Sequence, residues 1–156
     1  MSRLFVTGDT HCNACGEFSK LNAKNFPQQK DLTKDDFVVI AGDFGLLWCG
    51  SSEERYWLDW MEDKPFTTLF VDGNHENHAM LADFPVEEWH GGKIHRIRQS
   101  IIHLMRGQVF EDIAGLRVFS MGGASSHDIQ DGILDPDDSF FEEEYRKLRR
   151  RGAMFR

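Results

Sequence analysis

The first half of the chain repeats one pattern three times: a short apolar strand, a loop with Gly-Asp or Gly-Asn, and a helical stretch. The expected strands cover residues 4–6, 37–41 and 67–71, and the helical stretches cover residues 18–25, 53–62 and 77–83. The strands are β-branched or aromatic, and the second is almost continuously apolar, as expected of a strand buried on both faces. Alternation of strand and helix predicts right-handed crossovers and a parallel sheet, and therefore an α/β fold.

The second half changes to successive strands, expected at residues 94–97, 101–105, 109–113 and 116–121. Ala114-Gly115 is the expected hairpin turn between the last two. From residue 135 the chain is charged, with an acidic block at 135–144 and a basic run at 146–151, which predicts a solvated helix to about residue 150. We expect residues 1–156 to form a single domain, because a chain of this length can bury one core.

Charge and hydropathy exclude some classes of protein. The net charge of −8 argues against the basic surface of a nucleic-acid-binding protein. The longest apolar runs, such as residues 37–41, are too short to cross a bilayer, so we expect no membrane partner. The N-terminus lacks the apolar stretch and cleavage site of a signal peptide, and the expected location is cytoplasmic.

Hard metal ligands follow the three strands of the first half. Asp9 and His11 are two residues apart, so in an extended segment both side chains leave one face and can reach one ion. Asp43 and Asn74 each follow a glycine, which lets the backbone turn sharply at the strand end. Carboxylate, imidazole and amide oxygen together suit Mn, Fe or Zn better than Ca. Ligands in open parallel sheets bind at the carboxyl ends of the strands, so a metal site is predicted there.

These blocks resemble those of a known enzyme family, the calcineurin-like metallophosphoesterases. The similar motifs are Gly8-Asp9-Thr10-His11, Gly42-Asp43-Phe44-Gly45 and Gly73-Asn74-His75-Glu76, in the family's order and spacing. Gly122-Gly123-Ala124 is also similar to a segment of bacterial members. The resemblance implies an αββα sandwich that hydrolyses phosphate mono- or diesters with water activated by two divalent metal ions.

The resemblance also implies roles for single residues. Asp9 and His11 would hold the first metal, Asp43 would bridge both ions, and Asn74 would hold the second. His75 would be the catalytic residue that faces the leaving group, either protonating it or stabilising the transition state. Asp72 or Glu76 could orient His75, although each could equally be a solvated loop residue.

The sequence departs from the family after its third block. The family adds two later histidine blocks, one of them Gly-His-x-His, and this chain has neither. We therefore expect the N-terminal part of the full family domain, truncated at its C-terminus, with self-association through exposed sheet edges. Among the other histidines, His95 and His103 fall within strands and favour a core role. His78 is expected at the surface, and His127 lies on a loop that could approach the site.

The substrate and two rival functions stay open. A phosphorylated small molecule, a nucleotide or a phosphoprotein would each fit the chemistry. The first rival is a catalytically incomplete metal-binding or assembly module without turnover. The second is a zinc or redox protein that uses Cys12 and Cys15, although no second cysteine pair completes a zinc site.

Overall fold

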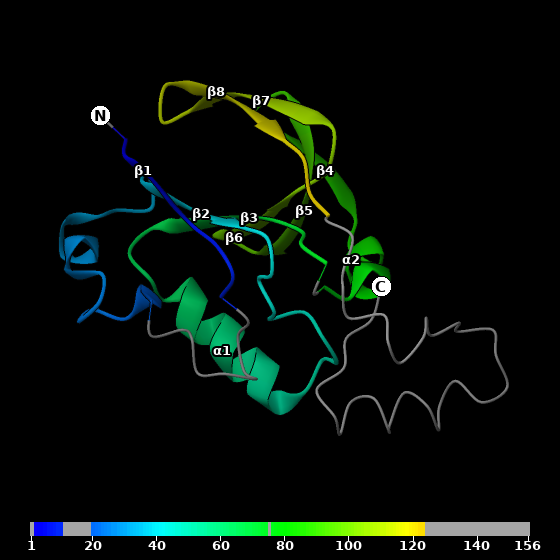
Figure 1. Ribbon diagram of the computed structural model, residues 1–156, viewed down its shortest axis with the longest axis horizontal. Helices are drawn as coiled ribbons and strands as arrows, with labels where there is room; N and C mark the ends of the chain where they lie inside the picture. Colours follow the sequence, from blue (N-terminus) through cyan, green and yellow to red (C-terminus); the bar gives the residue numbers. More distant parts are fainter. Residues whose placement is uncertain (1, 11–19, 75, 124–156) are drawn as a thin grey trace, which may run out of the picture.

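The computed structural model describes residues 2–10, 20–74 and 76–123, which form a six-stranded sheet and a separate β-hairpin (Figure 1). The sheet has the strand order β1-β2-β3-β6-β5-β4, and the hairpin joins β7 to β8. The strands are β1 (Leu4–Thr7), β2 (Phe37–Ala41), β3 (Thr67–Val71), β4 (Val86–Trp89), β5 (Gly92–Arg98), β6 (Ile101–Leu104), β7 (Gln108–Ile113) and β8 (Leu116–Ser120). The helices are the 3-10 helix η2 (Pro27–Asp31), α1 (Ser52–Glu62) and α2 (His78–Ala82).

The parallel arrangement expected for the three strands of the first half is confirmed for β1, β2 and β3, and the complete sheet is mixed. β1, β2, β3 and β6 run parallel, whereas β5 pairs antiparallel with both β6 and β4. The physical reason is connection length. Parallel neighbours need a long crossover, but β4 joins β5 through His90-Gly91 and β5 joins β6 through Gln99-Ser100, so both pairs are hairpins.

Two apolar clusters separate three layers, and β2 contributes to both. Val38 and Ile40 belong to the cluster beneath the sheet with Leu58 and Met61 of α1. Phe37 belongs to the cluster on the opposite face, with Phe110 and Ile113 of β7. Figure 1 shows α1 and the hairpin on opposite sides of the sheet. The α/β class is confirmed, and the α, β and β layers are consistent with a metallophosphoesterase fold.

Local hydrogen bonds explain why one of the predicted helices does not form. Residues 20–25, the described part of the expected helix 18–25, form a short 3-10 turn followed by hydrogen-bonded turns. The side-chain oxygen of Asn22 accepts the N–H groups of Lys24 and Asn25, and this local bonding competes with a helix. The strand β4 was not predicted either, because the pair Glu87-Glu88 interrupts its apolar character. The helix expected at 135–150 lies outside the described residues.

The Ala114-Gly115 turn is confirmed. Ile113 pairs with Leu116 across it, and both turn residues have positive φ, 51° and 76°. This left-handed pair is the geometry that matches the twist of two-residue hairpins. In the part of the chain that the structure describes, no helix is long and apolar enough to cross a membrane.

Candidate metal centre

The loops after β1 and β2 are bonded to each other directly beyond the strands. The N–H of Asp9 donates to the carbonyl of Gly42 at 3.1 Å, and the N–H of Thr10 donates to the carbonyl of Asp43 at 3.1 Å. The Thr10 side chain is fully buried, and its hydroxyl lies 3.2 Å from the carbonyl oxygens of Asp43 and Phe44. These contacts hold the backbones of Asp9 and Asp43 side by side.

Both aspartates have left-handed backbone conformations, which are rare for residues with a Cβ. The φ angles are 56° at Asp9 and 53° at Asp43. Aspartate tolerates this region better than most residues, but the conformation still carries strain, and such strain concentrates at functional sites. The same unusual geometry at two neighbouring strand ends therefore supports a functional centre here.

Gly73, directly before Asn74, allows the loop after β3 to pass close to Asp43. A Cβ on Gly73 would lie 2.0 Å from Oδ1 of Asp43 and 2.5 Å from its backbone nitrogen. Only glycine leaves room for the Asp43 carboxylate at this point. The structure thus places Asp9, Asp43 and Asn74 at the ends of β1, β2 and β3, three adjacent strands.

Glu76 ties the loop after β3 to the loop after β2. Its carboxylate is fully buried and accepts the N–H of Phe44 at 2.6 Å and that of Gly45 at 3.5 Å. Burial raises the pKa of Glu76 to about 8, against the opposing effect of these backbone hydrogen bonds. Glu76 therefore connects the loops that carry Asp43 and Asn74. The alternative that it is a solvated loop residue is wrong, because its side chain is buried.

Several predicted residues lie outside the described residues: His11, Cys12, Cys15, His75 and His127. Within residues 2–10, 20–74 and 76–123, no three His, Cys, Asp or Glu side chains gather closely enough to hold an ion. The ligand set formed by Asp9, His11, Asp43 and Asn74 and the role of His75 remain predictions.

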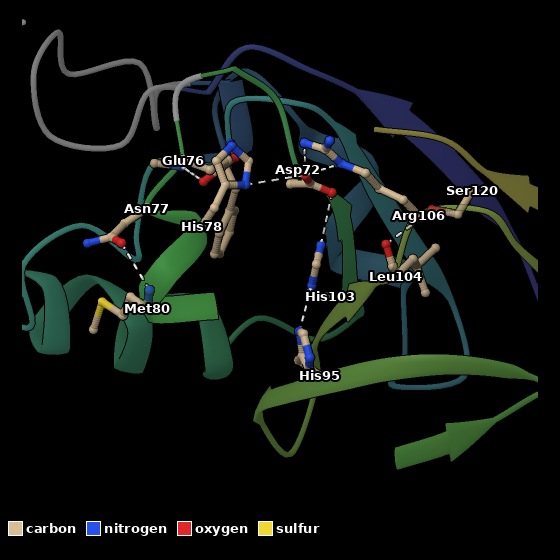
Figure 2. Close-up of polar contacts among 12 residues, drawn as sticks. Asp72, Glu76, Asn77, His78, Met80, His95, His103, Leu104, Arg106 and Ser120 are labelled. Carbon is tan, nitrogen blue, oxygen red and sulfur yellow. Dashed lines mark hydrogen bonds and ion pairs between the residues drawn. The ribbon is translucent and has the colours of Figure 1, made fainter. Parts of the chain in front are cut away.

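A second polar centre, which sequence reasoning missed, surrounds Asp72 at the end of β3 (Figure 2). Oδ1 of Asp72 lies 3.2 Å from Nε2 of His103, and Oδ2 accepts the Nε–H of Arg106 at 2.6 Å. Nδ1 of His78 lies 3.5 Å from Oδ2. Nδ1 of His103 lies 3.1 Å from Nδ1 of His95, so His95, His103 and Asp72 form a line across β5, β6 and β3.

The electrostatics of this centre keep Asp72 ionised. Burial alone would raise the pKa of Asp72, but hydrogen bonds and charge from His103 and Arg106 outweigh it and hold the pKa well below its usual range. Burial, followed by the neighbouring His103, lowers the pKa of His95. Burial also lowers the pKa of His78.

Sequence signals for this second centre were weak. The prediction that His95 and His103 lie within strands was confirmed, since they belong to β5 and β6. Both side chains are buried. Their mutual contact depends on the antiparallel register that pairs His95 with His103, and nothing local in the sequence reveals that register. His78, expected at the surface, is only half exposed because it lies against Asp72.

Lys20 adds a cation beside the first strand end. Its Nζ donates to the carbonyls of Gly8 at 3.1 Å and Asp9 at 2.8 Å. The ammonium group therefore holds the backbone of the loop that carries Asp9. Sequence reasoning did not single out this residue, because it follows the first loop with no motif around it.

Comparison with known proteins gives one family. The model of the family described as calcineurin-like phosphoesterase matches residues 2–151. No curated protein and no solved structure matches the chain significantly.

Proposed function

The chain belongs to the calcineurin-like phosphoesterase family, and from this premise we propose that it hydrolyses phosphate mono- or diesters at a two-metal site. Members of this family typically bind two metal ions. The proposed site lies at the ends of β1, β2 and β3, where Asp9, Asp43 and Asn74 follow adjacent strands. Family membership over nearly the whole chain is the observation that carries the proposal.

The residues at this end of the sheet fit a divalent cation. Asp9 and Asp43 offer carboxylate oxygens from strained left-handed conformations, and Gly73 leaves space beside Asp43 that a side chain would fill. Asp9 and His11 would hold the first metal, Asp43 would bridge, and Asn74 would hold the second. This donor set of carboxylate, imidazole and amide oxygen favours Mn, Fe or Zn.

The chemistry divides between the ions and the protein. When bound, the two ions would lower the pKa of a water molecule and neutralise charge on the phosphate oxygens. His75 would hold the proton that the leaving oxygen needs. Glu76 and Thr10 link the three loops through buried hydrogen bonds, which would preorganise the proposed ligands before substrate binds. The substrate would be a phosphorylated small molecule, a nucleotide or a phosphoprotein.

The test is manganese-dependent hydrolysis of p-nitrophenyl phosphate and bis-p-nitrophenyl phosphate. Asp43→Asn should reduce turnover by about a hundredfold or more, since even partners of metal ligands cost up to that much when removed. Asp35→Asn is the matched control, because Asp35 is exposed and precedes β2 at the opposite end of the strand. Absence of turnover in the wild-type chain with Mn, Fe and Zn would refute the proposal for this chain.

The alternative is an assembly or metal-binding module without turnover. One observation favours it: large apolar side chains are exposed on the hairpin and directly after it, with Phe119 63% and Met121 70% accessible. Exposed apolar groups of this size often mark surfaces that bind other chains. Metal analysis separates the two functions, because two equivalents of metal per chain favour the enzyme and one or none favours the module.

A further inference from the structure

Asp72 connects β3 to β6 through its side chain and to the loop after β8 through its backbone. Asp72 lies at the end of β3 and is only 3% exposed. Arg106, which binds its Oδ2, follows β6, and the loop after β8 reaches it through the backbone. The N–H of Gly123 donates to the carbonyl of Asp72 at 2.8 Å. The side chain of Asp72 is therefore held by a residue after β6, and its backbone by a residue after β8.

The two glycines after β8 fit closely around this ion pair. A Cβ on Gly122 would lie 2.5 Å from the carbonyl oxygen of Asp72 and 2.6 Å from its Oδ1. A Cβ on Gly123 would lie 2.4 Å from a guanidinium nitrogen of Arg106, and the φ of Gly123 is 77°. At Gly122 the atoms in the way include the backbone of Asp72, so the close approach requires glycine, whereas at Gly123 the positive φ favours glycine.

The histidine line fixes the other oxygen of Asp72. An ionised carboxylate only accepts, so Nε2 of His103 is assigned as the donor to Oδ1. Nδ1 of His103 also lies 3.1 Å from Nδ1 of His95, and the two rings are stacked with centroids 5.2 Å apart. Phe70 stacks on His103 at 4.9 Å. The carboxylate is thus held at both oxygens by groups that are themselves packed in place.

We propose that the Asp72–Arg106 ion pair positions Asn74 for the second metal. Asp72 precedes Asn74 by two residues, and only Gly73, the most flexible residue type, lies between them. Fixing the carboxylate and carbonyl of Asp72 limits the directions that the Asn74 side chain can take. This inference rests on the proposed function, and it assigns Asp72 and Arg106 as positioning residues and not as metal ligands.

Stability alone does not explain such a pair. Burying the Asp72 carboxylate costs solvation that its attraction to the half-exposed Arg106 side chain roughly repays, and an apolar residue of similar size often gives equal or greater stability. Leu69 and Phe70 of β3 and Ile101 of β6 are apolar and fully buried. The ion pair stands at the end of β3 that leads into the candidate ligand Asn74.

The experiment compares wild-type protein with Arg106→Gln, Arg106→Lys and the control Arg117→Gln. Arg117 makes the same kind of contact, with Nε 2.9 Å from Oε1 of Glu111, but this pair is exposed and lies within the hairpin. In metal-free protein, Arg106→Gln should increase amide exchange at Gly123 and shift the amide resonances of Gly73 and Asn74. In calorimetric titration of Arg106→Gln with Mn, the second equivalent of Mn should bind about tenfold more weakly than to wild-type protein, while the affinity for the first equivalent is unchanged.

The outcomes separate the two proposals. Arg106→Lys, which keeps the charge, should recover part of the second-site affinity, and Arg117→Gln should match wild type throughout. Unchanged Mn binding and unchanged Asn74 resonances in Arg106→Gln would overturn the positioning role. Fewer than two Mn in the wild-type chain would instead refute the proposed function, and the Asn74 resonances would still decide whether the ion pair fixes this backbone. If Arg106→Gln does not fold, Arg106→Lys tests the positioning role instead. It should then bind the second equivalent of Mn more weakly than wild type and the first equivalent with unchanged affinity.

Discussion

Replacing Thr68 with valine should stabilise the protein, although it removes a polar group from the middle of β3. Thr68 is fully buried, and its Oγ1 is a buried side-chain atom without a hydrogen-bond partner in the described part of the chain. Alternation along the strand places it on the same face as Phe70, toward the apolar cluster that includes α1. Valine keeps the β-branched shape and removes only the hydroxyl.

The magnitude follows from the unpaired hydroxyl. Burying a hydroxyl without a hydrogen bond costs about 1–3 kcal/mol in proteins, so Thr68→Val should raise the free energy of unfolding by about 1–2 kcal/mol. In a chain of this size each kcal/mol corresponds to a rise of about 2–4 °C in Tm. Urea unfolding followed by circular dichroism measures the change, provided that the m-value stays constant.

The adjacent threonine is the matched control. Thr67 is also buried, but its hydroxyl donates to the carbonyl of Lys34 at 2.7 Å. Thr67→Val should therefore lower the free energy of unfolding by about 1 kcal/mol, opposite in sign to its neighbour. If Thr68→Val destabilised the protein as much as Thr67→Val, the Thr68 hydroxyl would have a partner such as a buried water, and the reasoning would fail.

Three further predictions concern other parts of the fold. Ser51→Ala should lower the free energy of unfolding by about 1 kcal/mol, because the Ser51 side chain accepts the N–H of Glu54 at the start of α1; Ser52→Ala, next to the cap, should change it little. The pKa of His95 is lower in the folded than in the unfolded chain, so protonation favours unfolding. The contribution of His95 to the free energy of unfolding should therefore fall as the pH drops below about 6.5, so the stability of wild type relative to His95→Gln should decline with falling pH, whereas a constant difference would contradict the assignment. Phe119→Lys should reduce self-association in sedimentation velocity, because Phe119 is 63% exposed beside Val109 on the hairpin; wild-type protein that stays monomeric at high concentration would exclude association through this face.

Predictions from sequence succeeded where one local pattern decides the structure. The bounds of β2 and β3 agree with the expected 37–41 and 67–71, because both are short β-branched or aromatic runs between polar loops, and β2 is almost continuously apolar. α1 was expected within one residue of its true start, which Ser51 fixes as the N-cap. Residues 20–25 failed because the side chain of Asn22 bonds locally, an effect that hydrophobic periodicity does not register.

The strand-end positions of Asp9, Asp43 and Asn74 could be predicted because each follows its own strand directly. The surroundings of Asp72 could not, since Arg106 and His103 lie 34 and 31 residues away in sequence. Their meeting depends on β6 adding to β3 in parallel, which is a property of the sheet and not of any local segment.

This difference bears on how the metal centre is built. The residues that would touch metal come from local motifs, whereas the groups that hold those motifs in place, Arg106 and the Gly122-Gly123 loop, come from the later strands. A chain that retained the three motifs but lost β6 or β8 would keep its candidate ligands and lose the ion pair that fixes Asp72. The first three motifs therefore identify the chemistry, while the second half of the described chain determines how rigidly Asn74 is presented for it.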